Sequence, residues 1–488
     1  MQQEKRTMKR ALPYLFVTLI FATILNLSRA SYSFINTHDE DDNIVSGFLM
    51  SRNNLQMSKE IFTHHLPGAY LISEVLDRTF QPTGTDQSVY VHRTFITIWN
   101  YVWAVVLVSV WGPFSVWLVL VVELLRASYL HGLFQAENLV IYPMVYLLLT
   151  FVTERKTHPL LSGFSTGLIA VLLSPLWPLI LSTSCRFLWF NRLKPKYIVL
   201  WLVAFLIPVV WTLVKIDVRG FATQFFGYNV QTYAPLLINN PVKYTLKVFL
   251  APALVMKNLS LTTKNISIQL LVLFLFIFDF KRIKFRTLII FGLLLGMIGY
   301  RSVPGLNNVL DFHALPWVAA LGALCWYKYF GAIRQKGFLW NLVLLVPLFM
   351  FLMNPSDYFP NQKQAGKMVI RYADKSPVVN YLNSIKATGD TLFTLPAHTL
   401  LYQQTNIIPF NKFLFYLPWM EQSPILYTEL VDSFQDRLPT FLFIDKIHFP
   451  YFPPDEISKL LKNYEEVKIV ENEPPVYILN NYQFSITK

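Results

Sequence analysis

Four consecutive carboxylates, Asp39-Glu40-Asp41-Asp42, follow the first apolar stretch and are the residues best suited to acid-base chemistry. A carboxylate beside an acceptor hydroxyl can remove its proton as a general base. The same run is also typical of a solvated acidic turn that caps a helix, here one expected to start near Ile44. Support for a catalytic interpretation must therefore come from other parts of the chain.

Three other polar groups could contribute to such a site. Glu137 opens a long apolar stretch, where a carboxylate is costly in lipid, although an acid at a helix start is also ordinary. Arg301 opens a polar segment that leads into Phe312-His313-Ala314-Leu315-Pro316, and its side chain could equally extend to the membrane surface. The third group is also typical of an interfacial belt, and contains Arg219, Tyr228, Asn229, Tyr233, Lys243 and Lys247.

These groups favour transfer chemistry at a membrane surface. Cations can stabilise an anionic leaving group such as a lipid phosphate. The sequence has no Walker loop, dinucleotide fingerprint, zinc spacing or nucleophile elbow. We therefore expect a donor that is already activated on a lipid, and no cofactor is assigned. A divalent metal is compatible with the acids, but no other ligand spacing supports one.

The composition predicts an integral membrane protein. Of the 488 residues, 54% are hydrophobic and only 15% are charged, which is too apolar for an ordinary soluble domain. The net charge of +13 comes from short basic clusters between apolar stretches, where it sets membrane orientation, so no nucleic-acid partner is expected. Cys185 and Cys325 provide no disulfide framework.

The basic clusters predict a multi-pass plasma-membrane protein with about eleven spans, a cytoplasmic N-terminus and an outer loop at 29–89. We expect an uncleaved first span at 11–28, with a signal peptide as the alternative. Proline at 175 should divide 160–184 into two short helices that meet at an outer tip. The other expected spans are 90–111, 114–129, 137–152, 197–215, 266–280, 287–300, 312–326 and 338–353, with 243–256 along the outer interface.

The composition changes after Asn354, which divides the chain into a membrane domain at 1–354 and an extracytoplasmic domain at 355–488. Strand-like runs alternate there with helical ones, which predicts a small α/β domain. The expected strands are 391–395, 441–445, 466–470 and 476–479, and the expected helices include 378–385 and 456–464.

In this order, the motifs resemble those of GT-C glycosyltransferases of the protein O-mannosyltransferase and aminoarabinose transferase type. The first loop carries Asp39-Glu40-Asp41 and then Thr63-His64-His65-Leu66-Pro67-Gly68-Ala69-Tyr70. Arg93 and Glu137 fall where that family places an arginine and a second acid. The run 312–316 and the outer C-terminal domain also match. One departure is Ser174-Pro175, where relatives often carry a lysine that would contact the donor phosphate.

The resemblance implies an α-helical polytopic membrane protein of GT-C type with a C-terminal extracytoplasmic α/β domain. It would transfer a hexosyl or pentosyl group, with inversion, from a polyprenyl-phosphate donor to an acceptor protein, lipid or glycan on the outer face. Asp39, Glu40 or Asp41 would supply the base, with Glu137 as a further catalytic candidate. The implied substrate-binding residues are His64, His65, Tyr70, Arg93, Arg219, Arg301 and His313.

Two other functions are consistent with this sequence. A transporter or flippase would predict internal repeats and ionisable residues at mid-membrane, neither of which stands out. A non-catalytic scaffold of envelope glycan synthesis has no distinguishing sequence feature.

Overall fold

A computed structural model of the chain divides into two compact units, neither of which is continuous in sequence. The first unit comprises residues 1–32, 93–211 and 238–367, and the second comprises 33–92, 212–237 and 368–488. The predicted domain boundary at residue 354 lies outside the described residues. The structure describes 2–29, 38–128, 132–153, 158–233, 235, 313, 315–336, 376–396, 398–416, 420, 422–445, 455–469, 471, 474–480 and 482.

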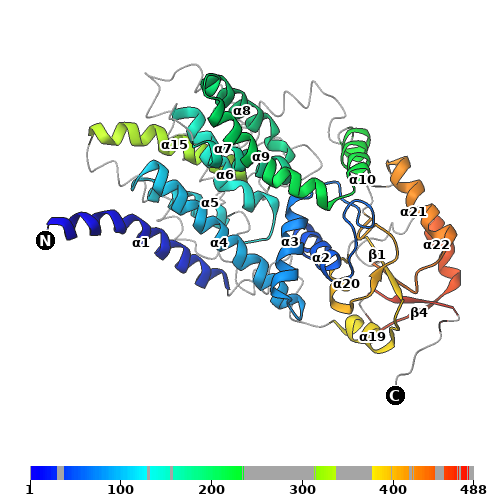
Figure 1. Ribbon diagram of the computed structural model, residues 1–488. Coiled ribbons are helices and arrows are strands. Elements are labelled where there is room, and N and C mark those ends of the chain that lie inside the picture. Colours follow the sequence, from blue (N-terminus) through cyan, green and yellow to red (C-terminus); the bar gives the residue numbers. More distant parts are fainter. Residues whose placement is uncertain are drawn as a thin grey trace, which may run out of the picture. The chain divides into compact units, whose positions relative to one another are not determined.

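The first unit is helical in the residues that the structure describes (Figure 1). Two long helices, α4 and α9, run from this unit into segments of the second. The helices are α1 (Gln2–Arg29), α4 (Thr85–Trp111), α5 (Ser115–Ser128), α6 (Ala136–Thr153), α7 (Pro159–Leu172), α8 (Trp177–Asn191), α9 (Pro195–Lys215) and α15 (Leu315–Lys336).

The predicted break in the segment 160–184 is confirmed. Helix α7 ends at Leu172, a single 3-10 turn occupies Ser174–Leu176, and α8 begins at Trp177. Pro175 lies in the first turn after the break, where its missing N–H removes no helical hydrogen bond. The chain therefore forms two short helices at this point, as its prolines predict.

Helices α7 and α9 approach each other closely at two glycines of α7. A Cβ atom added to Gly163 would collide with the backbone carbonyl of Trp201, and one added to Gly167 would collide with that of Phe205. Glycines spaced four residues apart on an apolar helix let two backbones meet in this way. The α7–α9 packing therefore depends on the absence of side chains at these two positions.

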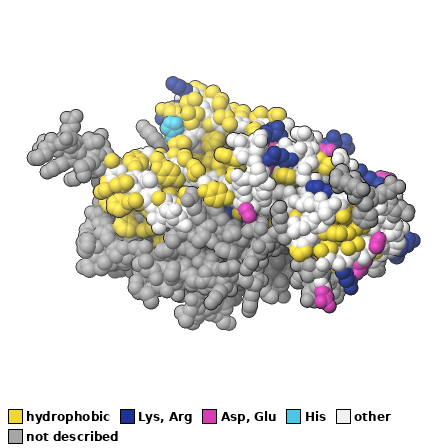
Figure 2. All heavy atoms as spheres, turned by 90° about the horizontal axis from the view of Figure 1, so that it is seen from below, with side chains coloured by type: hydrophobic (Ala, Val, Ile, Leu, Met, Phe, Trp, Pro, Cys, Tyr) yellow, Lys and Arg dark blue, Asp and Glu magenta, His cyan; other side chains and the backbone are white. Residues whose placement is uncertain are grey.

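The outer surface of the first unit is apolar where α9 faces outward. Val199, Val203 and Ile207 are among its exposed large hydrophobic residues, and Figure 2 shows broad hydrophobic patches on one face of the molecule. Among the described residues, two helices are long and apolar enough to cross a membrane, Thr85–Trp111 and Pro195–Lys215. Four shorter helices are apolar as well: Ala11–Asn26, Ala136–Val152, Pro159–Leu172 and Leu315–Tyr327.

The total of about eleven spans stays a prediction. The spans expected at 266–280, 287–300 and 338–353, and the interfacial segment at 243–256, lie outside the described residues.

The second unit combines the first loop with the C-terminal region. Its helices before the C-terminal region are α2 (His38–Arg52), α3 (Gly68–Phe80), α10 (Val218–Ala222) and the π-helical turns of η2 (Thr223–Tyr233). The C-terminal region adds α19 (Pro377–Ile385), α20 (Leu400–Thr405), α21 (Pro424–Asp436), α22 (Asp455–Leu460), η6 (Leu461–Asn463) and five strands. The strands are β1 (Thr391–Leu395), β2 (Ile408–Pro409), β3 (Phe441–Ile444), β4 (Tyr464–Val467) and β5 (Val476–Leu479).

The five strands form one mixed sheet in the order β2-β1-β3-β5-β4. Strand β1 pairs in parallel with β2 and β3, while β5 pairs in antiparallel fashion with β3 and β4. The side chains of Leu392, Phe393 and Leu442 are fully buried, because the central strands are covered on both faces. Strands β1, β3, β4 and β5 lie at or within a few residues of the predicted positions, whereas β2 was not predicted. The extracytoplasmic location of this region stays a prediction.

The close approach of α7 and α9 predicts the effect of one added methyl group. Gly167→Ala should lower the free energy of unfolding by roughly 1–3 kcal/mol, because the Phe205 carbonyl occupies the space that the methyl group needs. Thermal unfolding of the detergent-solubilised protein measures this change. Gly84→Ala is the matched control, since an added Cβ meets no atom within 4 Å there. Equal stability of both variants would show that the helices separate at no cost.

Candidate functional site

The acidic run forms the start of α2. Asp39, Glu40 and Asp41 lie in its first turn, where negative charge is stabilised by the unpaired N–H groups and the helix dipole. Asp39 is half-buried, whereas Glu40, Asp41 and Asp42 are buried. The interpretation as a solvated turn is therefore wrong for three of the four acids. The helix begins at His38 and contains the acidic run, whereas that interpretation placed the helix start near Ile44.

Asp42 is the acid that the structure joins to the second motif of the first loop. The Tyr70 hydroxyl donates a hydrogen bond to Asp42 Oδ2 at 2.6 Å, and both side chains are buried. Burial raises the pKa of the Asp42 carboxyl to about 7, against the opposing effect of the Tyr70 hydrogen bond. The structure thus joins the acidic run to Tyr70 through Asp42, which was not among the predicted bases.

Ion pairs secure the two helices that carry these groups. Arg52 on α2 pairs with Asp77 on α3 at 3.1 Å, and Asp77 also accepts a short hydrogen bond from Ser51. Glu74 on α3 pairs with Arg78 at 2.9 Å and with Lys215 at 3.2 Å. The spacing of Glu74 and Arg78 is a recognisable helix signal in sequence. The pairing of Asp77 with Arg52 has no local signal, because the partners lie on different helices.

The two predicted histidines of the first loop lie in an aromatic cluster. The rings of His64 and His65 are 3.9 Å apart, and the His64 ring also contacts Tyr228 and Phe415. Asn229 donates a hydrogen bond to the His64 carbonyl at 2.9 Å. These contacts give His64 a packing role within the second unit, and its role in substrate binding stays a prediction.

The first loop contacts the C-terminal region through Phe62. The Phe62 N–H donates to the Lys412 carbonyl at 2.7 Å, and its ring packs on Phe413 at 5.3 Å.

Arg219 lies elsewhere in the second unit: it is exposed on α10, which begins after the N-cap Asp217. The described contacts therefore do not bring Arg219 to the acidic run.

In the first unit, the structure brings together two residues that were predicted separately. His313 Nδ1 lies 2.6 Å from Glu137 Oε1, and the side chains are 12% and 7% exposed, respectively. Glu137 stands in the first turn of α6, while His313 precedes α15, and these two helices pack together. A buried carboxylate bonded to an imidazole fixes the orientation of both groups and can hold or pass a proton between them.

A second polar cluster in the first unit was not predicted. Glu123 and Arg126 of α5 form a buried pair at 2.6 Å, and the Tyr142 hydroxyl donates to Glu123 at 2.8 Å. Arg126 Nη1 has no hydrogen-bond partner among the described residues. The signal was visible in sequence as two opposite charges, three positions apart, inside a predicted span.

The remaining candidates are less well defined. Arg93 is fully buried on α4, and Arg301 lies outside the described residues. No group of three His, Cys, Asp or Glu side chains could hold a metal ion within the part of the chain that the structure describes.

Comparison with known proteins finds solved structures with a similar fold. No protein-family model matches the sequence, and no curated protein matches it significantly. ArnT from Cupriavidus metallidurans in the apo state is similar in structure, with a TM-score of 0.57, 10% identity and coverage of 95% of this chain and 97% of that one. ArnT from the same organism bound to undecaprenyl phosphate gives a TM-score of 0.58 with the same identity and coverage.

At this identity the likeness establishes the fold alone. The chain has an ArnT-like fold over nearly its whole length. The mannosyltransferase subtype is not part of this finding and stays a prediction.

The raised pKa of Asp42 predicts a pH dependence of stability. Between the ordinary pKa of 3.8 and about 7, the folded chain holds a proton on Asp42 that the unfolded chain has lost. The free energy of unfolding should therefore fall as pH rises through this window. Asp42→Asn should flatten the slope, because the amide does not titrate. Thermal unfolding midpoints at pH 5 and pH 7.5 measure the difference.

The control for this measurement is Asp432→Asn, which changes an exposed carboxylate on α21. Asp432→Asn should keep the slope of the unchanged protein. An unaltered slope in Asp42→Asn would contradict the assignment.

Proposed function

We propose that the protein is a membrane glycosyltransferase that moves a sugar from a polyprenyl-phosphate donor to an acceptor. The observation that carries this proposal is the structural similarity to ArnT, which covers 95% of the chain. One of the similar ArnT structures was solved with bound undecaprenyl phosphate. The absence of a recognisable nucleotide-binding motif supports a lipid-linked donor. The apolar helices of the first unit are consistent with a location in the membrane.

The proposed reaction is a single displacement at the anomeric carbon. A carboxylate of the first loop takes the proton of an acceptor hydroxyl, and the oxygen forms a bond to the anomeric carbon. The bond from that carbon to the phosphate oxygen breaks, its electron pair leaves with the polyprenyl phosphate, and the configuration is inverted. The sugar is a hexosyl or pentosyl group, and the acceptor is a protein, lipid or glycan on the extracytoplasmic face.

Asp39 is our leading candidate for the base. It is half-buried at the start of α2, so its carboxylate remains accessible, whereas Asp41 is 2% exposed. Asp42 is less suited to this role, because Tyr70 occupies one of its oxygens and the carboxyl is largely protonated below pH 7. Asp41 is the second candidate, and Glu40 the third.

The other buried polar groups fit supporting roles. We assign the Glu137–His313 pair to orienting the acceptor or relaying its proton, because the two groups are already joined at 2.6 Å. Arg93 and Arg301 remain candidates for the donor phosphate, and Arg126 joins them because one of its guanidinium nitrogens has no hydrogen-bond partner in the described part of the chain. An arginine in this role would replace the lysine that relatives often carry where this chain has Ser174-Pro175.

Radiolabelled sugar transfer from a polyprenyl-phosphate donor in proteoliposomes tests the proposal. Asp39→Asn should reduce transfer about 100-fold or more, because a positioned general base contributes a factor of that order. Asp41→Asn should then have the smaller effect. Glu137→Gln should also reduce transfer, since the amide cannot exchange a proton with His313. Asp432→Asn, on the exposed face of α21, serves as the control and should transfer sugar normally.

Full transfer by both Asp39→Asn and Asp41→Asn would exclude Asp39 and Asp41 as the base. No transfer by the unchanged protein to any acceptor would instead favour a transporter, a flippase or a scaffold.

A further inference from the structure

A cavity of about 860 Å³ lies in the first unit, away from the acids and histidines discussed above. It is lined by the end of α6, the start of α7, the last turns of α8 and the start of α9. In the predicted topology this is the cytoplasmic end of these helices, because the basic clusters 155–156 and 186–196 are both placed inside. The cavity is therefore separate from the outer face where sugar transfer is proposed.

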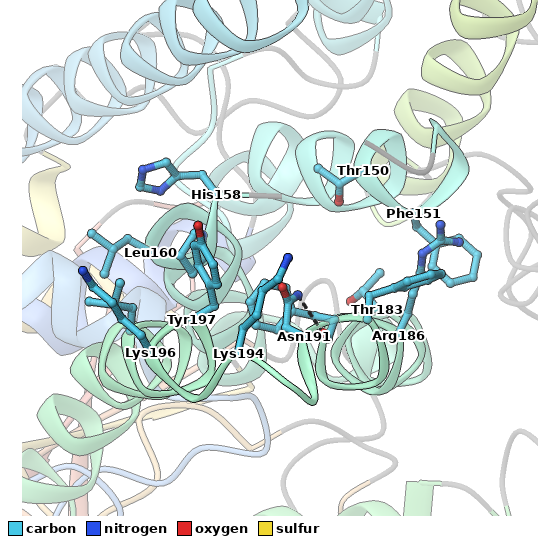
Figure 3. A pocket seen from close by; sticks show the side chains of 14 residues that line it. Thr150, Phe151, His158, Leu160, Thr183, Arg186, Asn191, Lys194, Lys196 and Tyr197 are labelled. Carbon is cyan, nitrogen blue, oxygen red and sulfur yellow. Dashed lines mark hydrogen bonds between the residues drawn. The ribbon is translucent and has the colours of Figure 1, made fainter. Parts of the chain in front are cut away.

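The charged groups of this cavity are cationic. Arg186, Lys194 and Lys196 line it, together with His158, and none of its fourteen described lining residues is Asp or Glu. Figure 3 shows Lys194 between Arg186 and Lys196 along the cavity. Three cations in a partly enclosed space repel one another unless an anion lies between them. The cavity is electrostatically complementary to a phosphate group.

The cations are held in place by local structure. The guanidinium carbon of Arg186 lies over the Phe151 ring at 5.0 Å and over the Phe190 ring at 5.1 Å, so cation–π contacts with both rings restrict its position. Lys194 belongs to a tight turn, in which its N–H donates to the Asn191 carbonyl at 2.7 Å. Lys196 stands in the first turn of α9, where helical N–H groups add further positive potential.

The surroundings of the cavity favour a lipid as the source of that phosphate. Phe190 and Leu193 are 65% and 86% exposed, respectively, and Tyr197 is exposed beside them. Exposed aromatic and aliphatic side chains next to lysine and arginine are typical of the membrane interface. The apolar wall formed by Leu160, Phe187 and Leu200 can accept an acyl chain, which a free anion does not have.

We propose that this cavity binds the phosphate head group of an anionic membrane lipid. Arg186 contacts the phosphate from α8, Lys194 from the turn that follows α8, and Lys196 from the first turn of α9. Basic pockets between membrane helices bind anionic lipid head groups by this means. The site is independent of the proposed sugar transfer, and it would fasten the α8–α9 turn to one leaflet.

The test measures lipid retained by the full chain. The purified protein is placed in nanodiscs that contain equal amounts of phosphatidylglycerol and phosphatidylcholine, and the lipids that remain bound are counted by native mass spectrometry. The unchanged protein should retain phosphatidylglycerol preferentially. Arg186→Gln combined with Lys194→Gln should reduce that retention at least about tenfold, because each of these cations contacts the head group and contributes a factor of about five.

Arg192→Gln is the matched control. Arg192 lies in the same turn but does not line the cavity, and its guanidinium is 4.6 Å from the Trp189 ring. Its replacement should leave retention unchanged. Equal retention of both lipids by the unchanged protein, or undiminished retention by the double variant, would overturn the proposal. So would displacement of the bound lipid by millimolar inorganic phosphate, which would identify a site for a free anion.

A second measurement does not depend on how the double variant folds. A photoreactive phosphatidylglycerol is cross-linked to the unchanged protein, and the labelled peptides are identified. Labelling should concentrate in peptides from 177–200. Labelling confined to other helices would overturn the proposal.

Discussion

A carboxylate that leaves water must gain a hydrogen-bond donor or a cation, and this requirement connects the helices of the protein. Asp42 meets Tyr70 between α2 and α3, and Asp77 meets Arg52 between the same helices. In the other unit, Glu123 meets Tyr142 between α5 and α6, and Glu137 meets His313 before α15. Each of these bonds fixes the register of two segments, which nonspecific apolar packing does not do alone.

The features that could be predicted from sequence are those with local causes. Prolines after Leu172 end one helix and begin the next, and strand β1 occupies the short apolar run that predicts it. The acidic run starts a helix, because carboxylates are favoured at that end. In each case the physical cause lies within a few residues of the feature, so tertiary contacts were not needed to find it.

The features that could not be predicted depend on partners far away in sequence. The burial of Asp42 follows from its packing against α3, so nothing in the run distinguishes Asp42 from Asp39. The contact of Glu137 with His313 joins segments that are separated by several helices. Glu123 and Arg126 are different, because two opposite charges three positions apart in an apolar segment are a local feature that predicts an ion pair.

The contact between Phe62 and Lys412 has a consequence for how the protein is made. A chain emerges from the ribosome from its N-terminus, so the first loop leaves long before the strands and helices of the C-terminal region exist. The ring of Phe62 therefore lacks its aromatic partners until Phe413 and Phe415 have been synthesised. The completed second unit is therefore a late product of biosynthesis, and an incomplete chain stopped before residue 412 would lack the surface on which this loop rests.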